Sequence, residues 1–315
     1  MVKIGFFGTP EISAYVLKEL YDAGFEISWV VTQPDRKAGR GLKLSPPPVK
    51  LKAQELGLKV FQSEKFDREL YDSVMLHPVD LSVVIAYGSY IPTYFINSSD
   101  LNPLNIHVSL LPKYRGAAPV ARAIMNGDDV SGVTIMKVVK EMDAGDIVAQ
   151  KQVEISQQDN VDTLTWKLVK EGVKLLVSVI PSYLNSSIKV VKQSETGITP
   201  SYAEKILAKD KVINWTKKAK EIHDQVRALY PWPVAEAKIN DIDIKITKTS
   251  LVSYHSDAEA GEIVDISRKN GTMTVSTNEG VLLVEKVQPF GKREMQVSEF
   301  INGYKIEKGM RFKNV

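Results

Sequence analysis

The opening stretch of the sequence, residues 1–20, reads MVKIGFFGTPEISAYVLKEL and decides the class of the fold. Residues 2–7 form an apolar run that predicts a β-strand, and Gly8-Thr9-Pro10 predicts the turn that ends it. After the turn, apolar side chains recur at helical spacing, at Ile12, Val16, Leu17 and Leu20. A strand, a tight turn and an amphipathic helix together form the first half of an α/β unit.

Further short apolar runs predict more strands of the same sheet. They lie at residues 27–31, 81–86, 104–108 and 133–139. The stretches between them are long enough for the crossover helices that parallel strands require. An apolar stripe at helical spacing over residues 160–184 predicts the long helix that closes this domain. We therefore expect an α/β domain with a Rossmann-like, mostly parallel sheet over residues 1–187.

The second half of the chain has a different pattern. The apolar periodicity fades after residue 187, and we expect a basic linker at residues 188–209. A short amphipathic helix should follow and end at Pro231-Trp232-Pro233, because proline cannot continue a helix. Five β-like runs with hairpin turns come next, at residues 235–239, 242–247, 261–266, 273–276 and 281–287. They predict an OB-like β-barrel domain over residues 210–315, with Trp232 in its core.

The composition excludes several classes of protein. The chain of 315 residues has no cysteine, which excludes disulfides, thiolate catalysis and cysteine-ligated metal centres. Its four histidines include no close pair, so we expect no metal site. No apolar run is long enough to cross a bilayer, and the N-terminus enters a strand without a basic leader. We therefore expect a cytoplasmic protein that does not bind membranes. We also expect a monomer.

Positive charge gathers in two segments of the chain. The net charge is only +3, but residues 33–52 carry six basic residues against one acidic, and residues 188–220 carry eight against three. Either segment could face the phosphates of a nucleic acid. Taken alone, a charged run of this kind is better explained as a solvated surface, because charge clusters are common and phosphate binding needs a suitable geometry.

The strand predicted at residues 104–108 ends in polar side chains. Asn105 and His107 are two residues apart on an extended chain, so their side chains point to the same side. Ligands of open α/β sheets bind at the carboxyl edge of the strands. A dinucleotide is not favoured there, because the turn Gly8-Thr9-Pro10-Glu11 lacks the G-x-G-x-x-G pattern. One pocket at this edge can therefore receive both side chains.

An acidic turn, residues 141–146, lies between two later strand-like runs and contains Asp143. A carboxylate here can orient or charge the imidazole of His107. Asn105, His107 and Asp143 could then catalyse acyl transfer to an amine without a protein nucleophile. Asn105 and His107 would donate hydrogen bonds to the developing oxyanion, and Asp143 would help to remove a proton from the amine. A packed histidine beside turn-forming acids is an equally good interpretation of the same residues.

These residues resemble the signature of the 10-formyltetrahydrofolate-dependent formyltransferases. The signature includes Asn105, His107, Ser109-Leu110-Leu111-Pro112, residues 132–136 and the acidic turn with Asp143. The sequence is most similar to the members of this family that act on methionyl-tRNA, and the similarity runs nearly end to end. It includes residues 7–10, 32–41, 86–88 and 227–233.

The resemblance implies an activity and a site. It implies that the formyl group of 10-formyltetrahydrofolate moves to the α-amino group of initiator methionyl-tRNA, by direct attack of the amine and through a tetrahedral intermediate. The implied catalytic residues are Asn105, His107 and Asp143. The implied folate contacts are Ala86, Tyr87, Gly88, Ser109, Leu110, Leu111 and Pro112. Lys137 and Lys140 depart from the usual residues of the family, which leaves the rim of the folate site open.

The basic segment at residues 36–43 favours a tRNA substrate. Glycine alternates there with Arg and Lys, which predicts a mobile loop that can meet phosphates or bases. The resemblance implies that this loop inserts at the acceptor end of the tRNA. The expected tRNA contacts are Arg36, Lys37, Arg40 and Lys43 in the loop, and Lys209, Lys211, Lys217 and Lys218 at the linker and barrel.

Two other functions stay open at the level of sequence. The first is a formyltransferase of UDP-linked amino sugars, for which Asn105, His107, Asp143 and the Ser-Leu-Leu-Pro segment would be equally suitable. The basic loop at residues 36–43 argues against it, because such relatives lack the loop. The second is a non-catalytic RNA-binding protein built from an inactive enzyme domain and a basic barrel. The intact set of Asn105, His107 and Asp143 argues against that function.

Overall fold

The structure is a computed structural model that describes residues 1–38, 43–254, 256–268 and 270–313. The chain divides into two compact units. Unit 1 consists of Met1–Gly116, Ser131–Val153 and Trp166–Tyr202, and unit 2 consists of Ala117–Val130, Glu154–Thr165 and Ala203–Val315. The chain therefore passes between the units several times. The domain boundaries expected at residues 187 and 210 stay predictions.

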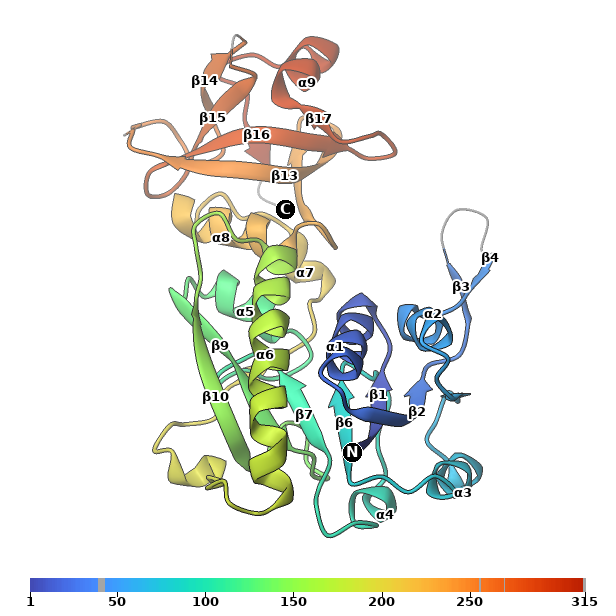
Figure 1. Ribbon diagram of the computed structural model, residues 1–315. Coiled ribbons are helices and arrows are strands. Elements are labelled where there is room, and N and C mark those ends of the chain that lie inside the picture. The colour runs from blue at the N-terminus through green and yellow to red at the C-terminus, as the bar shows by residue number, and fades with distance from the viewer. Residues whose placement is uncertain (39–42, 255, 269, 314–315) are drawn as a thin grey trace. The chain divides into compact units, whose positions relative to one another are not determined.

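The described residues of unit 1 form a seven-stranded sheet (Figure 1). Its strands, in order across the sheet, are β10 (Ile147–Glu154), β9 (Val130–Lys137), β7 (Leu104–His107), β6 (Leu81–Ile85), β1 (Lys3–Gly8), β2 (Glu26–Thr32) and β5 (Val60–Gln62). From β7 to β5 all neighbours pair in parallel, whereas β9 is antiparallel to β7. The predicted Rossmann-like, mostly parallel sheet is confirmed.

Helices cover both faces of this sheet. One face packs against α1 (Glu11–Asp22), α2 (Pro48–Glu55) and α6 (Val161–Leu184), and the other against α3 (Arg68–Met75) and α4 (Thr93–Ile96). Phe6 lies in the first core and Phe7 in the second, because successive side chains of a strand point to opposite faces. A Cβ atom at Gly5 would lie 2.1 Å from the ring of Trp29. Glycine at this position therefore leaves room for the buried indole.

The described residues of unit 2 form an antiparallel sheet that curls into an OB-like half-barrel (Figure 1). Its strands, in order, are β14 (Ile263–Ser267), β15 (Thr272–Ser276), β16 (Val281–Pro289), β13 (Ile242–Val252), β12 (Ala235–Ile239) and β18 (Phe312–Lys313), with β17 (Met295–Gln296) beside β16. The helices are α8 (Ala219–Leu229), which contacts β13, α5 (Pro119–Met125), which contacts α8, and α9 (Val297–Tyr304), which contacts β16. The predicted class of the second fold is confirmed.

Some short elements have no clear pattern in the sequence. Part of the basic segment forms a hairpin of β3 (Arg36–Ala38) and β4 (Lys43–Ser45), and residues 39–42 between them lie outside the described residues. The other short elements are β8 (Arg115–Gly116), the 3₁₀ turn η1 (Gln193–Glu195), β11 (Tyr202–Ala203) and α7 (Ala208–Lys211). In the part of the chain that the structure describes, no helix combines the length and the apolar character needed to span a bilayer.

The prediction that Trp232 lies in the barrel core is wrong. Its side chain is 81% exposed. Helix α8 ends at Leu229, before the first proline, so Trp232 stands outside both the helix and the sheet. The core instead holds Trp215 against Phe312, with ring centroids 4.7 Å apart. The turn formed by Pro231-Trp232-Pro233 therefore keeps the Trp232 side chain out of the core.

A buried histidine on α8 lies among charged groups of unit 2. His223 is 8% exposed, and its Nδ1 atom lies 2.9 Å from the hydroxyl oxygen of Thr249. Burial lowers the pKa of His223, and the nearby Arg227 guanidinium lowers it further, while Asp224 acts in the opposite direction. Folding therefore favours the neutral imidazole at this position.

This shift predicts a pH-dependent stability. Below the ordinary histidine pKa of about 6.5, the unfolded chain binds a proton that folded His223 resists, so the free energy of unfolding should fall as the pH falls. The contribution of one proton is at most about 1.4 kcal/mol per pH unit. Urea denaturation between about pH 5 and pH 7.5 measures it, and His223→Gln should remove this part of the slope. His77→Gln is the control, and an equal slope in wild type and His223→Gln would contradict the prediction.

Candidate active site

The carboxyl ends of β1, β6 and β7 meet at one edge of the unit 1 sheet, because these strands are parallel neighbours. The turns that follow β1 and β6 are tied together. The Thr9 hydroxyl donates to the carbonyl of Tyr87 at 2.7 Å, and the Ser13 hydroxyl donates to the carbonyl of Ile85 at 2.8 Å. The residues expected to bind a ligand therefore follow adjacent strands of a rigid sheet.

His107, the last residue of β7, lies between two acceptors. Its ring is buried, and Nε2 is 3.0 Å from the carbonyl oxygen of Tyr114. Its Nδ1 atom is 3.6 Å from Oδ1 of Asp143, the distance of an ion-pair contact. A carbonyl can only accept a hydrogen bond, so Nε2 carries a proton and donates it. The ring therefore presents Nδ1 to the carboxylate, and a proton gained there places the positive charge beside Asp143.

Asn105 lies on the same strand and on the same side of it as His107. It is opposite Met136 of β9, and its side chain is partly exposed. Within the residues that the structure describes, no group forms a hydrogen bond with its amide. The amide is therefore available to a ligand at this edge, as a donor or as an acceptor.

The turn that carries Asp143 is held in an uncommon conformation. Asp143 has a φ of 51°, in the left-handed region, where a non-glycine residue costs on the order of 1–3 kcal/mol. Its Oδ2 atom accepts from the backbone N–H of Gly116 at 2.8 Å. A Cβ atom at Gly145 would lie 1.8 Å from the carbonyl oxygen of Lys137, so glycine is required there. The Lys137 ammonium lies 3.5 Å from the Asp146 carboxylate, so this unusual lysine has a local partner.

Two residues of the predicted linker also contact this site, and neither was predicted from the sequence. The Gln193 amide donates to the carbonyls of Asp143 and Gly145, each at 2.8 Å. The hydroxyl of Ser201 accepts from the backbone N–H of Tyr114 at 2.9 Å. A polar stretch without periodicity gave no signal for either contact.

The segment Ser109–Pro112 is fixed by residues of β9 and β10. The Thr134 hydroxyl donates to the carbonyl of Ser109 at 2.7 Å and accepts from the N–H of Leu111 at 3.1 Å. The Gln150 amide donates to the carbonyl of Leu111 at 2.8 Å. Ser109 and Leu111 are buried, whereas Leu110 packs against Gly132. The backbone of this segment is thus held in place beside His107.

The other segment expected to bind folate turns sharply after β6. Ala86 has a φ of 45° and Gly88 a φ of 80°, and both are exposed. Between them, Tyr87 packs with Phe7 and Phe95 in the core, and burial raises its pKa to about 12. The Tyr87 side chain therefore anchors the turn, and the main chain on either side of it faces outward.

The basic residues expected to bind tRNA differ in their surroundings. Arg36, Lys37 and Lys43 are exposed on the β3–β4 hairpin, and Arg40 lies outside the described residues. The Lys211 ammonium lies 2.8 Å from Glu236, and the Lys218 ammonium lies 2.6 Å from Glu279. Lys209 and Lys217 are exposed and form no ion pair with any described residue. Of the four lysines at the linker and barrel, these last two therefore have no carboxylate partner that competes with a phosphate among the described residues.

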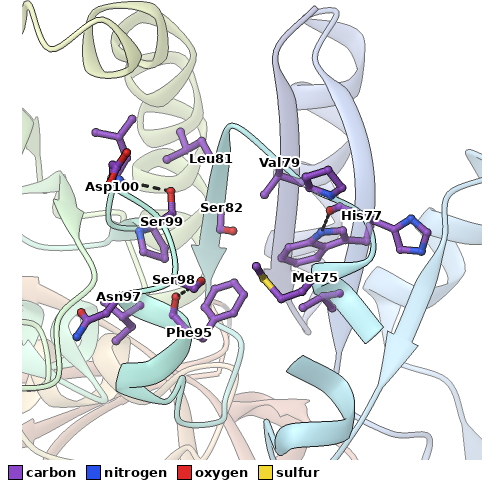
Figure 2. A pocket seen from close by; sticks show the side chains of 16 residues that line it. Met75, His77, Val79, Leu81, Ser82, Phe95, Asn97, Ser98, Ser99 and Asp100 are labelled. Atoms are coloured by element: carbon purple, nitrogen blue, oxygen red, sulfur yellow. Dashed lines mark hydrogen bonds between the residues drawn. The ribbon is translucent and has the colours of Figure 1, made fainter. Parts of the chain in front are cut away.

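A cavity of about 390 Å³ lies in unit 1 at the opposite end of the strands (Figure 2). Leu81 and Pro103, at the amino ends of β6 and β7, line it together with Trp29. The Trp29 indole donates to the carbonyl of His77 at 3.0 Å. None of the residues expected to bind folate or to act in catalysis lines this cavity. It is distinct from the carboxyl edge described above.

The sequence matches two family descriptions. Residues 2–180 match "Formyl transferase", and residues 205–305 match "Formyl transferase, C-terminal domain". A methionyl-tRNA formyltransferase of Sulfurihydrogenibium sp. (strain YO3AOP1) is 39% identical over 313 residues, which are 99% of this chain and 100% of the relative. The chain belongs to the methionyl-tRNA formyltransferase family. Another relative of this family, from Bacillus subtilis (strain 168), is 38% identical over 98% of this chain and 97% of its own length.

Solved structures share the fold of this member of the methionyl-tRNA formyltransferase family. An N-formyltransferase from Helicobacter canadensis, in complex with folinic acid and dTDP-3-aminofucose, has a TM-score of 0.68 at 22% identity and covers 92% of this chain and 100% of its own. HypX from Aquifex aeolicus, in complex with tetrahydrofolic acid, has a TM-score of 0.66 at 14% identity and covers 96% of this chain and 47% of its own. At these identities the likeness concerns the fold.

Proposed function

We propose that the protein transfers the formyl group of 10-formyltetrahydrofolate to the α-amino group of initiator methionyl-tRNA. The observation that supports the proposal is the contact of His107 with Asp143 at the carboxyl edge of the sheet, with Asn105 on the same side of the same strand as His107. Relatives that are 38–39% identical over almost the whole chain are methionyl-tRNA formyltransferases. The folate is a substrate of this reaction, and the chemistry needs no metal ion and no protein nucleophile.

In the proposed reaction the substrate amine attacks the formyl carbon. A C–N bond forms and the formyl carbonyl oxygen becomes an oxyanion. Collapse of the tetrahedral intermediate restores the carbonyl and breaks the bond to the folate nitrogen, which takes up the proton lost by the new amide nitrogen and leaves as tetrahydrofolate. Asn105 donates a hydrogen bond to the oxyanion. Both ring nitrogens of His107 face protein acceptors. We therefore assign to His107 the stabilisation of the oxyanion by the positive charge of its ring and not by a direct hydrogen bond.

Asp143 has two roles in this mechanism. Its Oδ1 atom faces Nδ1 of His107 and balances the charge of the protonated ring. Directly or through a water molecule, the carboxylate also takes the proton that the attacking ammonium must lose. The contact of Oδ2 with Gly116 keeps the carboxylate oriented for both roles.

The two backbone segments beside the trio suit the folate. Around Ala86 and Gly88 the main chain faces outward, so its N–H and C=O groups can pair with a flat, polar heterocycle such as a pterin. Ser109–Pro112 lies beside His107 and is fixed by Thr134 and Gln150. Because this segment is already rigid, it can hold the formyl carbon next to Asn105 without a further loss of its own conformational entropy on binding.

We expect the wild-type protein to formylate initiator methionyl-tRNA with 10-formyltetrahydrofolate and to leave a UDP-linked amino sugar unmodified. Asn105→Ala and His107→Ala should each lower kcat on the order of 10²-fold, because each removes an interaction made with the oxyanion. Formylated product is measured by acid-gel separation of the tRNA, and circular dichroism checks folding. A preference for the amino sugar, or near-normal rates in the two folded variants, would contradict the proposal.

The surroundings of the lysines predict unequal contributions to tRNA binding. Lys209→Ala with Lys217→Ala should weaken binding and reduce the slope of log K against log salt by roughly 2, since each lost phosphate contact removes about 1. Lys211→Ala with Lys218→Ala is the matched control, and it should change the slope less because Glu236 and Glu279 already pair with these lysines. Filter binding at several salt concentrations measures both. Equal slopes of log K against log salt in the two double variants would show that ion pairing in the free protein does not decide which lysines contact the tRNA phosphates.

A further inference from the structure

The segment of residues 193–201, expected from the sequence to be part of a linker, packs against both loops that hold His107. The backbone N–H of Arg115 donates to the carbonyl of Ser201 at 2.8 Å, and the N–H of Tyr114 donates to the Ser201 hydroxyl at 2.9 Å. These bonds fix the carbonyl of Tyr114, which accepts from His107. The other partner of the ring, Asp143, is held by a different residue of the same segment.

Gln193 holds the Asp143 turn through its side chain. The residue is 4% exposed. Its amide nitrogen donates to the carbonyl oxygens of Asp143 and Gly145, each at 2.8 Å. Its amide oxygen accepts from Nε and Nη2 of Arg115, at 3.0 Å and 2.7 Å. All donors and acceptors of one buried side chain are thus directed to the two loops around His107.

The geometry of the Asp143 turn shows why this support matters. Asp143 is left-handed, and such a conformation persists only where the surroundings fix it. Its carboxylate lies 3.6 Å from Nδ1 of His107, so a small rotation of the turn changes the ion-pair contact directly. Without the Gln193 amide, the carbonyls of Asp143 and Gly145 lose their donor in a largely buried place. The turn would then relax toward a more common conformation.

We propose that Gln193 is a positioning residue, which sets the distance and orientation of the Asp143 carboxylate relative to the His107 ring. The inference rests on the proposed roles of His107 and Asp143 in formyl transfer. Gln193 itself touches neither substrate nor the reacting atoms in this account. Its effect on the reaction is therefore indirect and should appear in the chemical step and not in substrate binding.

Two substitutions at this position separate the contacts. Gln193→Ala removes all four hydrogen bonds. Gln193→Glu keeps the size of the side chain and the acceptor for Arg115, but it cannot donate to the carbonyls of Asp143 and Gly145. We expect both variants to lower kcat by about 10–100-fold while KM for folate and for tRNA stays within about 2-fold. A fall in Gln193→Ala that Gln193→Glu reverses would overturn the inference, because the link to Arg115 would then suffice.

A second readout does not depend on activity. The chain has four histidines, so the Cε1–H resonance of His107 can be assigned with the His107→Ala variant. We expect its pH titration curve to shift in Gln193→Ala and in Gln193→Glu, because the facing carboxylate moves. The resonance of His223, which lies in unit 2, should keep its wild-type curve in both.

Gln225→Ala is the matched control. Gln225 is 9% exposed and also donates to two backbone carbonyls, those of Asp210 and Val212 at 2.9 Å and 3.0 Å, but neither belongs to the site. This variant should lose stability as Gln193→Ala does, without a change in kcat or in the His107 resonance. If folded Gln193→Ala keeps the wild-type kcat and the wild-type His107 titration curve, the inference about Gln193 is wrong, while the proposed function is unaffected. If the wild type forms no formyl-methionyl-tRNA, the proposed function fails, and the His107 titration then decides the inference about Gln193.

Discussion

The hydrogen bond from Nε2 of His107 to the carbonyl of Tyr114 is the constraint on which the arrangement of the site depends. A backbone carbonyl cannot donate, so this bond settles which ring nitrogen keeps its proton and turns the other nitrogen toward Asp143. A positive ring then has its counter-charge at 3.6 Å. Charge can thus appear and disappear on His107 without movement of the ring, which is the condition for stabilising an oxyanion by a preorganised group.

Much of the fold could be predicted because its elements follow the periodicity of their apolar side chains. Strand β12 covers the predicted residues 235–239, and α8 ends before Pro231 because proline cannot continue a helix. The same logic failed at Trp232, where an aromatic side chain suggested burial but the flanking prolines keep it exposed. The β3–β4 hairpin was missed, since the short strands Arg36–Ala38 and Lys43–Ser45 have no apolar alternation in the sequence.

In the candidate site, too, the features set by local strand geometry could be predicted, whereas those set by contacts between distant segments could not. The shared side of Asn105 and His107 follows from strand geometry, and Asp143 lies 3.6 Å from the His107 ring, where a carboxylate was expected. The supports of these residues could not be predicted. Gln193 reaches the Asp143 turn from a polar segment far along the chain, and the left-handed backbone of Asp143 depends on contacts that no local pattern encodes. Sequence periodicity describes which face a side chain occupies, whereas it carries no information on which distant loop holds it.

The most direct test of this account is the protonation pattern of the His107 ring in the free protein. Two-bond ¹⁵N–¹H correlation spectra, recorded across a pH titration of ¹⁵N-histidine-labelled protein, distinguish a protonated ring nitrogen from a bare one. The account predicts that Nε2 of His107 shows a protonated shift throughout and that Nδ1 is the nitrogen that gains and loses the proton. A neutral ring with its proton on Nδ1 and a bare Nε2 would contradict it, because the ring would then have no N–H to donate to the Tyr114 carbonyl.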